Sequence, residues 1–277
     1  MKTKNKSGEK SPVPKEGIYP EIIRDNYKGS EKLLDKKALI TGGDSGIGQA
    51  VAVHFAREGA DVAIVYHTSD DDAKETKKLV EQEGRECLLI KGDLVKPAFR
   101  KKIVDTVAKN WKTLDILVNN AGIHEEDPEI KTVTDEQILK TFDTNIMSMI
   151  SLTRDLLPAI PSGGKIICTT SVTSYRGSKQ LMDYAASKGA ITTFIRSLAT
   201  NLAEKNILVN GIAPGPIWTP LVKETKSKLK EFGKKTALGR AGHPSEVAPA
   251  YVFLASEDAR YITGEVIHIN GGDFVSG

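Results

Sequence analysis

Short apolar runs alternate with longer amphipathic segments along most of this chain. The pattern starts with KALITG, GIGQAVAVHFAREG, DVAIVY, DDDAKETKKLVEQEG and CLLIKGD, and it continues through LDILVNNAG, GKIICTTS, ILVNGIAPG and EVIHINGG. The runs lack the polar alternation of half-exposed strands, which is typical of parallel strands covered on both faces. Because crossovers between parallel strands are right-handed, few arrangements other than one sheet with helices on both sides remain. The sequence therefore predicts an α/β fold with a seven-stranded parallel sheet.

The length of the chain favours a single domain. Its 277 residues, of which 39% are hydrophobic, can form one large core, and we expect one Rossmann-type domain over residues 36–277. Helical patterns are expected near 134–158, 181–204 and 245–256. Residues 1–35 are rich in Lys, Pro, Glu and Gly, which predicts a flexible N-terminal extension and an arm on the surface. Ligands of such sheets bind beyond the carboxyl ends of the strands.

Charge and cysteine content narrow the kind of ligand. The balance of 39 basic and 36 acidic residues gives a net charge of only +3, which favours a small molecule over nucleic acid. Neither Cys87 and Cys168 nor the histidines have a metal-binding spacing, so we expect no metal site. Cys168 lies in an apolar run and is expected to be buried. With no signal-peptide pattern and no long apolar stretch, we expect a cytoplasmic protein without a membrane anchor.

A glycine-rich loop, TGGDSGIG at 41–48, directly follows the first apolar run and precedes a helical pattern. Glycines at 42, 46 and 48 allow a sharp turn and a close approach of the backbone to a ligand. The N–H groups and dipole at the start of the following helix favour an anion. The strand, turn and helix together therefore indicate a site for the pyrophosphate of a nucleotide.

A second group of reactive residues follows later strands. Tyr184 and Lys188 stand four positions apart in the helical stretch DYAASKGA, so they share one helix face. Taken alone, the pair is better explained as ordinary helix surface, because Tyr and Lys are common and such spacings are expected in any chain with several helices. Ser171 follows the run GKIICTT in a turn crowded with hydroxyl groups, and Asn145 lies within a helical pattern.

These motifs together resemble the short-chain dehydrogenase/reductase family. The family's TGxxxGxG pattern is matched by TGGDSGIG, and LVNNAG at 117–122, Ser171, YAASK at 184–188 and APGPIWTP at 213–220 follow in the family's order. The resemblance covers roughly residues 36–277 and implies an NAD- or NADP-dependent oxidoreductase that interconverts a carbonyl and an alcohol. The arm GIYPEIIRDNYKGSEKL is similar to the N-terminal extension of a bacterial subgroup described as glucose-dehydrogenase-like or general-stress oxidoreductases.

The resemblance implies a role for each catalytic candidate. Tyr184 would be the general acid/base, and Ser171 would donate a hydrogen bond to the substrate oxygen. A phenol has an ordinary pKa of about 10, so we expect the ammonium group of Lys188 to lower the pKa of Tyr184. Lys188 would also bind the nicotinamide ribose, and Asn145 would help to position Lys188 through a water.

The resemblance also implies a set of cofactor contacts. Asp93 would hydrogen-bond the adenine amino group, although a helix N-cap is an equally compatible role for it. The segment Asn119–Gly122 would lie beside the adenine ribose, and a buried asparagine pair that stabilises the strand is the alternative. The expected cofactor-binding residues are Gly42, Asp44, Ser45, Gly46, Ile47, Gly48, Tyr66, His67, Asp93, Leu94, Asn120, Ala121, Gly122, Tyr184, Lys188, Pro214, Gly215, Ile217 and Thr219.

The choice between NAD and NADP depends on the end of the second strand. Tyr66 occupies the position where an acid would accept from the ribose 2′-hydroxyl of NAD, and His67 follows it. Without a carboxylate at Tyr66, and with acids rather than bases in the glycine loop, we expect use of both cofactors with a preference below about tenfold. Comparison of kcat/KM for NADH and NADPH tests this expectation.

Segment 216–240 is expected to form a short helical lid with Val222, Leu229 and Phe232 facing inward. The apolar faces of 134–158 and 181–204, together with the family resemblance, imply a homotetramer. Two other functions were weighed against the oxidoreductase. One is a catalytically idle nucleotide sensor or scaffold on the same fold, and the other is a sugar-nucleotide epimerase or dehydratase, which fits the glycine spacing poorly.

Overall fold

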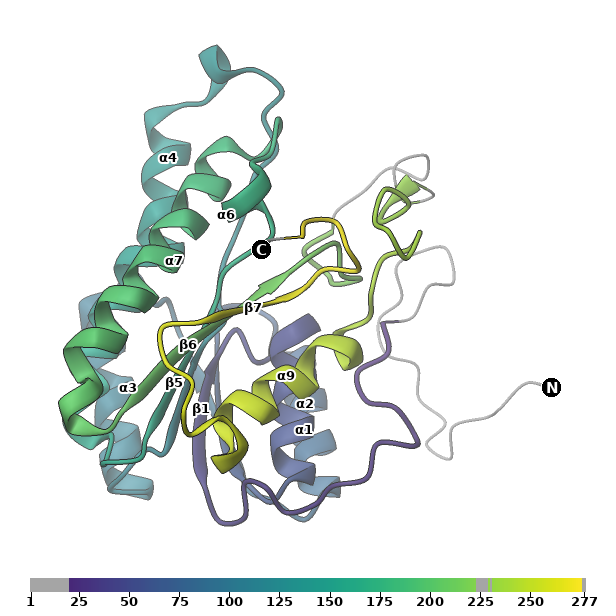
Figure 1. The fold of residues 1–277 in the computed structure, drawn as a ribbon. Helices are drawn as coiled ribbons and strands as arrows, with labels where there is room; N and C mark the ends of the chain where they lie inside the picture. Colours follow the sequence, from purple (N-terminus) through teal and green to yellow (C-terminus); the bar gives the residue numbers. More distant parts are fainter. Residues whose placement is uncertain (1–19, 223–228, 230, 276–277) are drawn as a thin grey trace.

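A computed structural model describes residues 20–222, 229 and 231–275 (Figure 1). Its centre is one parallel sheet of seven strands in the order β3-β2-β1-β4-β5-β6-β7. This confirms the predicted fold class and number of strands. The strands are β1 Lys37–Thr41, β2 Asp61–Tyr66, β3 Cys87–Lys91, β4 Ile116–Asn119, β5 Lys165–Thr169, β6 Leu208–Pro214 and β7 Val266–Ile269.

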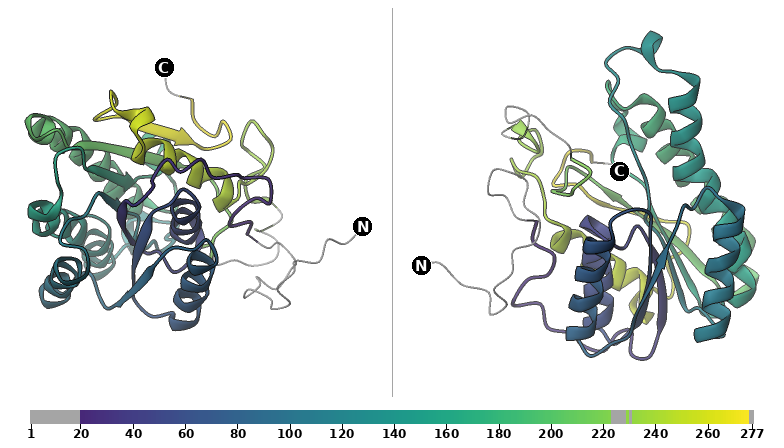
Figure 2. Two further views of the ribbon diagram at one scale, coloured as in Figure 1. Left: turned by 90° about the horizontal axis from the view of Figure 1, so that it is seen from below. Right: turned by 180° about the vertical axis from the view of Figure 1, so that it is seen from behind.

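Two layers of helices cover the sheet, and Figure 2 shows the sheet between them. The helices are α1 Gly46–Arg57, α2 Asp70–Gln82, α3 Pro97–Asn110, α4 Asp135–Phe142, α5 Ser148–Leu156, α6 Thr173–Arg176, α7 Met182–Leu202 and α9 Pro244–Ala255. Buried side chains of α1, α2 and α9 pack on one face of the sheet, and those of α3, α5 and α7 pack on the other. With both faces covered, the strands can be apolar on both sides, as their sequences indicated.

The helical pattern expected over 134–158 is interrupted at its centre. A π-helical turn, Asp143–Met147, joins α4 to α5. Such turns insert one extra residue into a helix and often occur at functional sites. Asn145 lies in this turn, so the interruption changes the direction of a predicted site residue. The patterns expected at 181–204 and 245–256 correspond closely to α7 and α9.

The order of the strands places a cleft at one edge of the sheet. From β1 the chain moves outward through β2 and β3, and then returns to β4 on the other side of β1. The loops after β1 and β4 therefore run in opposite directions and leave a crevice between them, where ligands of this kind of sheet bind. The glycine loop follows β1, and Asn120 follows β4.

The arm is attached more firmly than its composition indicated. Leu33 is fully buried, and Tyr27 donates a hydrogen bond of 2.6 Å to Glu58 at the end of α1. The guanidinium group of Arg57 donates to the carbonyl of Tyr27 at 2.9 Å. Residues 20–35 therefore form part of the packed domain, because a few apolar side chains along the arm find partners that local periodicity does not reveal. Residues 1–19 lie outside the described part.

The structure describes only part of the segment 216–240 that was expected to form a lid. Residues 223–228 and 230 lie outside the described residues, so a helix across the whole segment is untested. The rings of Trp218 and Phe232 pack with centroids 4.9 Å apart. Among the described residues, no helix is long and apolar enough to cross a membrane.

Candidate active site

A cavity of about 1160 Å³ opens at the carboxyl ends of the strands. Pockets for small molecules commonly have volumes of about 300–1,000 Å³, so this one has room for a dinucleotide with a second ligand beside it. All the residues expected to bind cofactor or catalyse line the cavity except Gly48 and Asn145. The lining set is Gly42, Asp44, Ser45, Gly46, Ile47, Tyr66, His67, Asp93, Leu94, Asn120, Ala121, Gly122, Ser171, Tyr184, Lys188, Pro214, Gly215, Ile217 and Thr219.

The glycine loop has the backbone geometry that its residues allow. Gly42 and Gly46 have φ of +62° and +55°, in the left-handed region that favours glycine. A Cβ atom at Gly48 would lie 2.0 Å from the carbonyl oxygen of Gly42, so no side chain fits there. Gly48 thus acts behind the cavity wall, where it lets α1 begin directly against the loop. The first turn of α1 has no acidic residue that would oppose an anion.

Asn120 joins the loops after β1 and β4, and the neighbouring Asn119 bonds within the core. The backbone N–H groups of Asn120 and Ala121 donate to Thr41 Oγ1 at 3.0 and 3.1 Å. In return, the side chain of Asn120 donates to the carbonyls of Thr41 and Gly42 at 3.1 and 3.0 Å. Asn119 donates to Thr153 at 3.0 Å within the core. These hydrogen bonds fit the stabilising role considered for the pair, but only Asn119 is buried, whereas Asn120 is half-buried and faces the cavity.

Tyr66 and His67, at the end of β2, also line the cavity. The hydroxyl of Tyr66 donates to Asp70 at 2.8 Å, and Lys91 pairs with the same carboxylate at 2.5 Å. Sequence reasoning placed no acid at Tyr66 itself, and it missed that Asp70 reaches this tyrosine from the first turn of α2. The spacing of four residues between Tyr66 and Asp70 was the feature of the sequence that could have indicated this contact.

Asp93, in the turn after β3, also lines the cavity. Its carboxylate accepts from the N–H of Val95 at 3.0 Å, which closes a turn after β3. The N-cap of α3 is Lys96, so the alternative role of Asp93 as a helix N-cap is wrong. The chain turns for three further residues before the helix begins, and the carboxylate satisfies that turn instead.

Ser171, Tyr184 and Lys188 converge on the cavity from two elements. Ser171 follows β5, and its hydroxyl oxygen accepts from the N–H and the hydroxyl of Thr173 at 3.2 and 3.0 Å. Tyr184, on α7, lines the same wall, and the Ser171 hydroxyl lies close enough to lower the pKa of its phenol. The ammonium of Lys188 lies 5.6 Å from the centre of the Tyr184 ring. These contacts place both hydroxyl groups at one part of the wall.

The pKa of Tyr184 is shifted in the direction opposite to our expectation. Burial raises the pKa of this phenol, and the nearby hydroxyl of Ser171 only partly counteracts it. Burial also lowers the pKa of Lys188 to about 8, and its ammonium donates to the carbonyl of Thr169 at 2.8 Å. The sequence placed the two groups on one face, but it did not reveal that desolvation disfavours the charged form of each.

Asn145 lies behind the cavity wall rather than in it. Its side-chain oxygen accepts from the N–H of Ile123 at 2.8 Å, and its amide donates to the carbonyl of Ile123 and to Ser187. A Cβ atom at Gly122 would lie 3.3 Å from both the Asn145 oxygen and the Lys188 nitrogen. Asn145 therefore fixes the loop after β4 beside the lysine, and Gly122 leaves room for both polar groups.

The remaining wall carries His124, two residues of the expected lid and Arg176, of which sequence reasoning did not select Arg176. His124 packs edge-to-face against Tyr184 with ring centres 5.5 Å apart. Arg176 lines the cavity from α6 and donates to Asp273 at 2.8 Å. Val222 and Phe232, two of the expected lid side chains, also line it. The pair of Arg176 and Asp273 joins positions 97 residues apart, and no local pattern indicates it.

Known proteins share much of the sequence of this chain. The family model described as enoyl-(acyl carrier protein) reductase matches residues 42–273. General stress protein 39 of Bacillus subtilis is 49% identical over 254 residues, which cover 91% of this chain and 89% of that protein. The chloroplastic NADPH-dependent aldehyde reductase 1 of Arabidopsis thaliana is 45% identical over 266 residues, with 93% and 92% covered.

A solved structure shows the same fold with a cofactor. A short-chain dehydrogenase from Burkholderia cenocepacia in complex with NADP superposes with a TM-score of 0.83 at 33% identity, covering 87% of this chain and 99% of that one. The chain belongs to the short-chain dehydrogenase/reductase family. It is an oxidoreductase that uses NAD or NADP, and its likeness to the general-stress subgroup is confirmed.

Proposed function

We propose that this protein interconverts a small carbonyl compound and the corresponding alcohol by hydride transfer, with Ser171, Tyr184 and Lys188 as the proton relay. The observation that carries this proposal is the meeting of the Tyr184 and Ser171 hydroxyls on the cavity wall, with the ammonium of Lys188 beside them. The name of the Arabidopsis relative, an aldehyde reductase, supports a carbonyl substrate.

The residues of the cavity fit a dinucleotide. The glycine loop and the start of α1 would hold the pyrophosphate, and Tyr66 and Asp93 would flank the adenosine. Lys188 would bind the nicotinamide ribose. When bound in its reduced form, the nicotinamide supplies a hydride to the carbonyl carbon.

The proton in the reductive direction comes from Tyr184. Its hydroxyl gives a proton to the carbonyl oxygen as the carbon gains the hydride, so that the C=O bond becomes an alcohol. Ser171 donates a hydrogen bond to the same oxygen while negative charge develops on it. Lys188 stabilises the resulting phenolate until Tyr184 is protonated again, and oxidation of an alcohol uses the same groups in reverse.

A panel of aldehydes, ketones and alcohols, assayed with both NADH and NADPH by nicotinamide absorbance, tests this function. Turnover of at least one carbonyl, lost in Tyr184→Phe, is the expected result. A protein that binds the cofactor yet turns over no compound in either direction would instead be the idle sensor or scaffold.

Cofactor use and assembly are part of the proposal. We expect both dinucleotides to serve, because the carboxylate nearest to Tyr66 belongs to Asp70 and is already paired with Lys91. We also propose a homotetramer, since α4, the π turn and α5 expose the apolar side chains Ile138, Met147 and Ile150. Light scattering at micromolar concentration tests the assembly, and a monomer would contradict it.

We further propose that residues 36–277 form the catalytic domain, that segment 216–240 acts as its lid, and that the protein works in the cytoplasm. Val222 and Phe232 on the cavity wall support the lid. Both cysteines are free and buried, which fits a reducing compartment. Fractionation of the producing cells tests the location.

A further inference from the structure

Glu21, near the start of the described arm, contacts the start of α9 with both its backbone and its side chain. The carbonyl of Glu21 accepts from the N–H of Ser245 at 2.9 Å, and the N–H of Glu21 donates to His243 Nδ1 at 3.1 Å. The hydroxyl of Ser245 donates to the Glu21 carboxylate, and Ser245 is fully buried beneath the arm. The arm therefore satisfies an N–H group that the start of a helix would otherwise leave without a partner.

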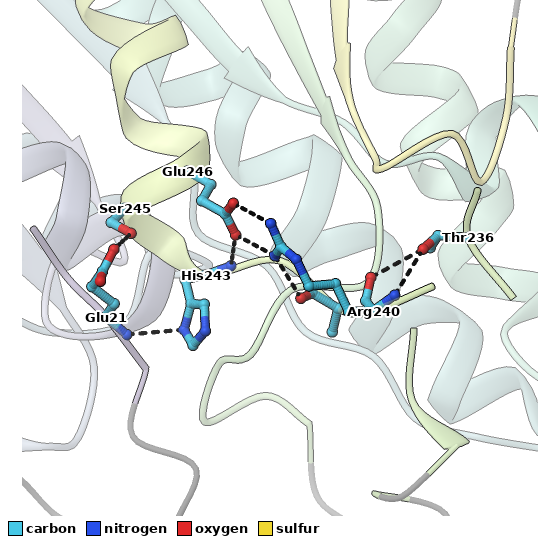
Figure 3. Close-up of polar contacts among 7 residues, drawn as sticks. Glu21, Thr236, Arg240, His243, Ser245 and Glu246 are labelled. Atoms are coloured by element: carbon cyan, nitrogen blue, oxygen red, sulfur yellow. Dashed lines mark hydrogen bonds and ion pairs between the residues drawn. The ribbon is translucent and has the colours of Figure 1, made fainter. Parts of the chain in front are cut away.

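The same turn of α9 also holds the segment 240–242, as Figure 3 shows for Arg240. The carboxylate of Glu246 accepts from the backbone N–H of His243 at 2.9 Å. It also accepts two hydrogen bonds from the guanidinium of Arg240, at 2.6 and 2.7 Å. A bidentate pair of this kind fixes orientation as well as distance. The segment 240–242 is thus tied to the turn that the arm contacts.

The segment 240–242 in turn pairs with the cavity wall. The N–H of Gly242 donates to the carbonyl of Pro216 at 2.9 Å, and the N–H of Trp218 donates to the carbonyl of Gly242 at 3.0 Å. Pro216 and Ile217 line the cavity, and Ile217 packs in the same core cluster as Ile22 and Ile23 of the arm. A continuous set of contacts therefore runs from the arm to the wall.

We propose that Glu21 is a positioning residue for the cofactor cavity. Glu21 acts through the start of α9 on the wall segment Pro216–Thr219. The arm then has a function beyond its contribution to the core. Loss of the Glu21 carboxylate frees the hydroxyl of buried Ser245 and loosens the turn that carries His243 and Glu246. The wall segment shifts with that turn, and cofactor affinity falls. The inference rests on the cofactor site and is independent of the identity of the substrate.

Three variants of the full chain separate positioning from simple stabilisation. Glu21→Ala removes the acceptor of the Ser245 hydroxyl, whereas Glu21→Gln keeps an oxygen acceptor at the same place. Tyr27→Phe is the matched control, because it removes a hydrogen bond of the same arm to Glu58, at the end of α1 and away from α9. The readouts are the Kd for NADPH from fluorescence titration and the melting temperature.

We expect Glu21→Ala to raise the Kd by about fivefold, within the range of measured coupling effects. Glu21→Gln should restore the affinity to within twofold of the unmodified protein, and Tyr27→Phe should lower the melting temperature without changing the Kd. An unchanged Kd in Glu21→Ala, or an equal rise in Tyr27→Phe, overturns the proposal. Because the titration needs no substrate, failure of the carbonyl panel does not alter its outcome.

Discussion

Replacement of Lys188 by methionine should stabilise the cofactor-free protein while it abolishes turnover. Lys188 is 3% exposed, and burial lowers its pKa from the ordinary 10.5 to about 8. Since each pKa unit corresponds to about 1.4 kcal/mol, keeping this ammonium charged inside the fold costs about 3 kcal/mol at pH 7. Loss of its hydrogen bond to the carbonyl of Thr169 costs about 1 kcal/mol in return.

The net gain for Lys188→Met is then about 2 kcal/mol, which corresponds to a rise in melting temperature of about 4 °C for a chain of this size. The gain should depend on pH with a definite sign. The pKa of Lys188 is lower in the folded chain, so above about pH 8 the folded state releases a proton that the unfolded state keeps. The stability of the unmodified protein relative to the variant therefore rises between pH 8 and 10.5, and the advantage of methionine shrinks.

Urea denaturation at pH 7 and pH 9.5 measures both effects without cofactor. Lys205→Met replaces an exposed lysine just beyond α7 and is the control, for which we expect no change at either pH. A Lys188→Met protein that is less stable than the unmodified one by the same amount at both pH values would refute the reasoning. It would mean that the hydrogen bond, and not the buried charge, determines the energetics of Lys188.

Three further predictions follow from the site. Tyr184→Phe should lower kcat by at least about 100-fold, the usual contribution of a general acid, while the NADPH Kd from fluorescence titration stays within about threefold. Gly48→Ala should weaken NADPH binding in the same titration, because its Cβ would lie 2.0 Å from the carbonyl oxygen of Gly42; unchanged affinity would contradict the geometry. Asp70→Asn removes a charge near Tyr66 and leaves Lys91 unpaired, so the kcat/KM ratio of NADPH to NADH should rise about fivefold, and a fall would show that Asp70 does not oppose the phosphate.

The fold was predictable because it depends on patterns that extend along the whole chain. Apolar runs without alternation, separated by helical periods, leave few topologies other than a parallel sheet. The glycine loop and Ser171 were then placed correctly by the rule that ligands bind beyond the carboxyl ends of strands. These predictions needed only the order of elements along the chain.

Contacts between distant segments could not be predicted in this way. The arm has a composition typical of a solvated extension, yet Leu33 is fully buried. The π turn around Asn145 depends on how α4 and α5 pack, and its sequence DTNIM is compatible with an ordinary helix. Asp70 and Tyr66 are only four residues apart, but the contact crosses from a strand end to a helix start. Each of these features is decided by packing rather than by local pattern.

For Tyr184 and Lys188, sequence spacing predicted the relative position of the two side chains but not their pKa values. The four-residue spacing correctly placed Tyr184 and Lys188 on one helix face, and we inferred from it that a charged lysine would lower the pKa of the phenol. In the folded chain both groups are buried, which raises the pKa of Tyr184 and lowers that of Lys188 to about 8, so burial disfavours the charged form of each although the ammonium still predominates at pH 7. Additional polar partners for Lys188 would favour its ammonium form again, and the ribose hydroxyls of a bound nucleotide would be such partners. A bound nucleotide would therefore raise the pKa of Lys188 and strengthen the positive charge beside the phenol, which is the condition that the spacing alone had led us to expect.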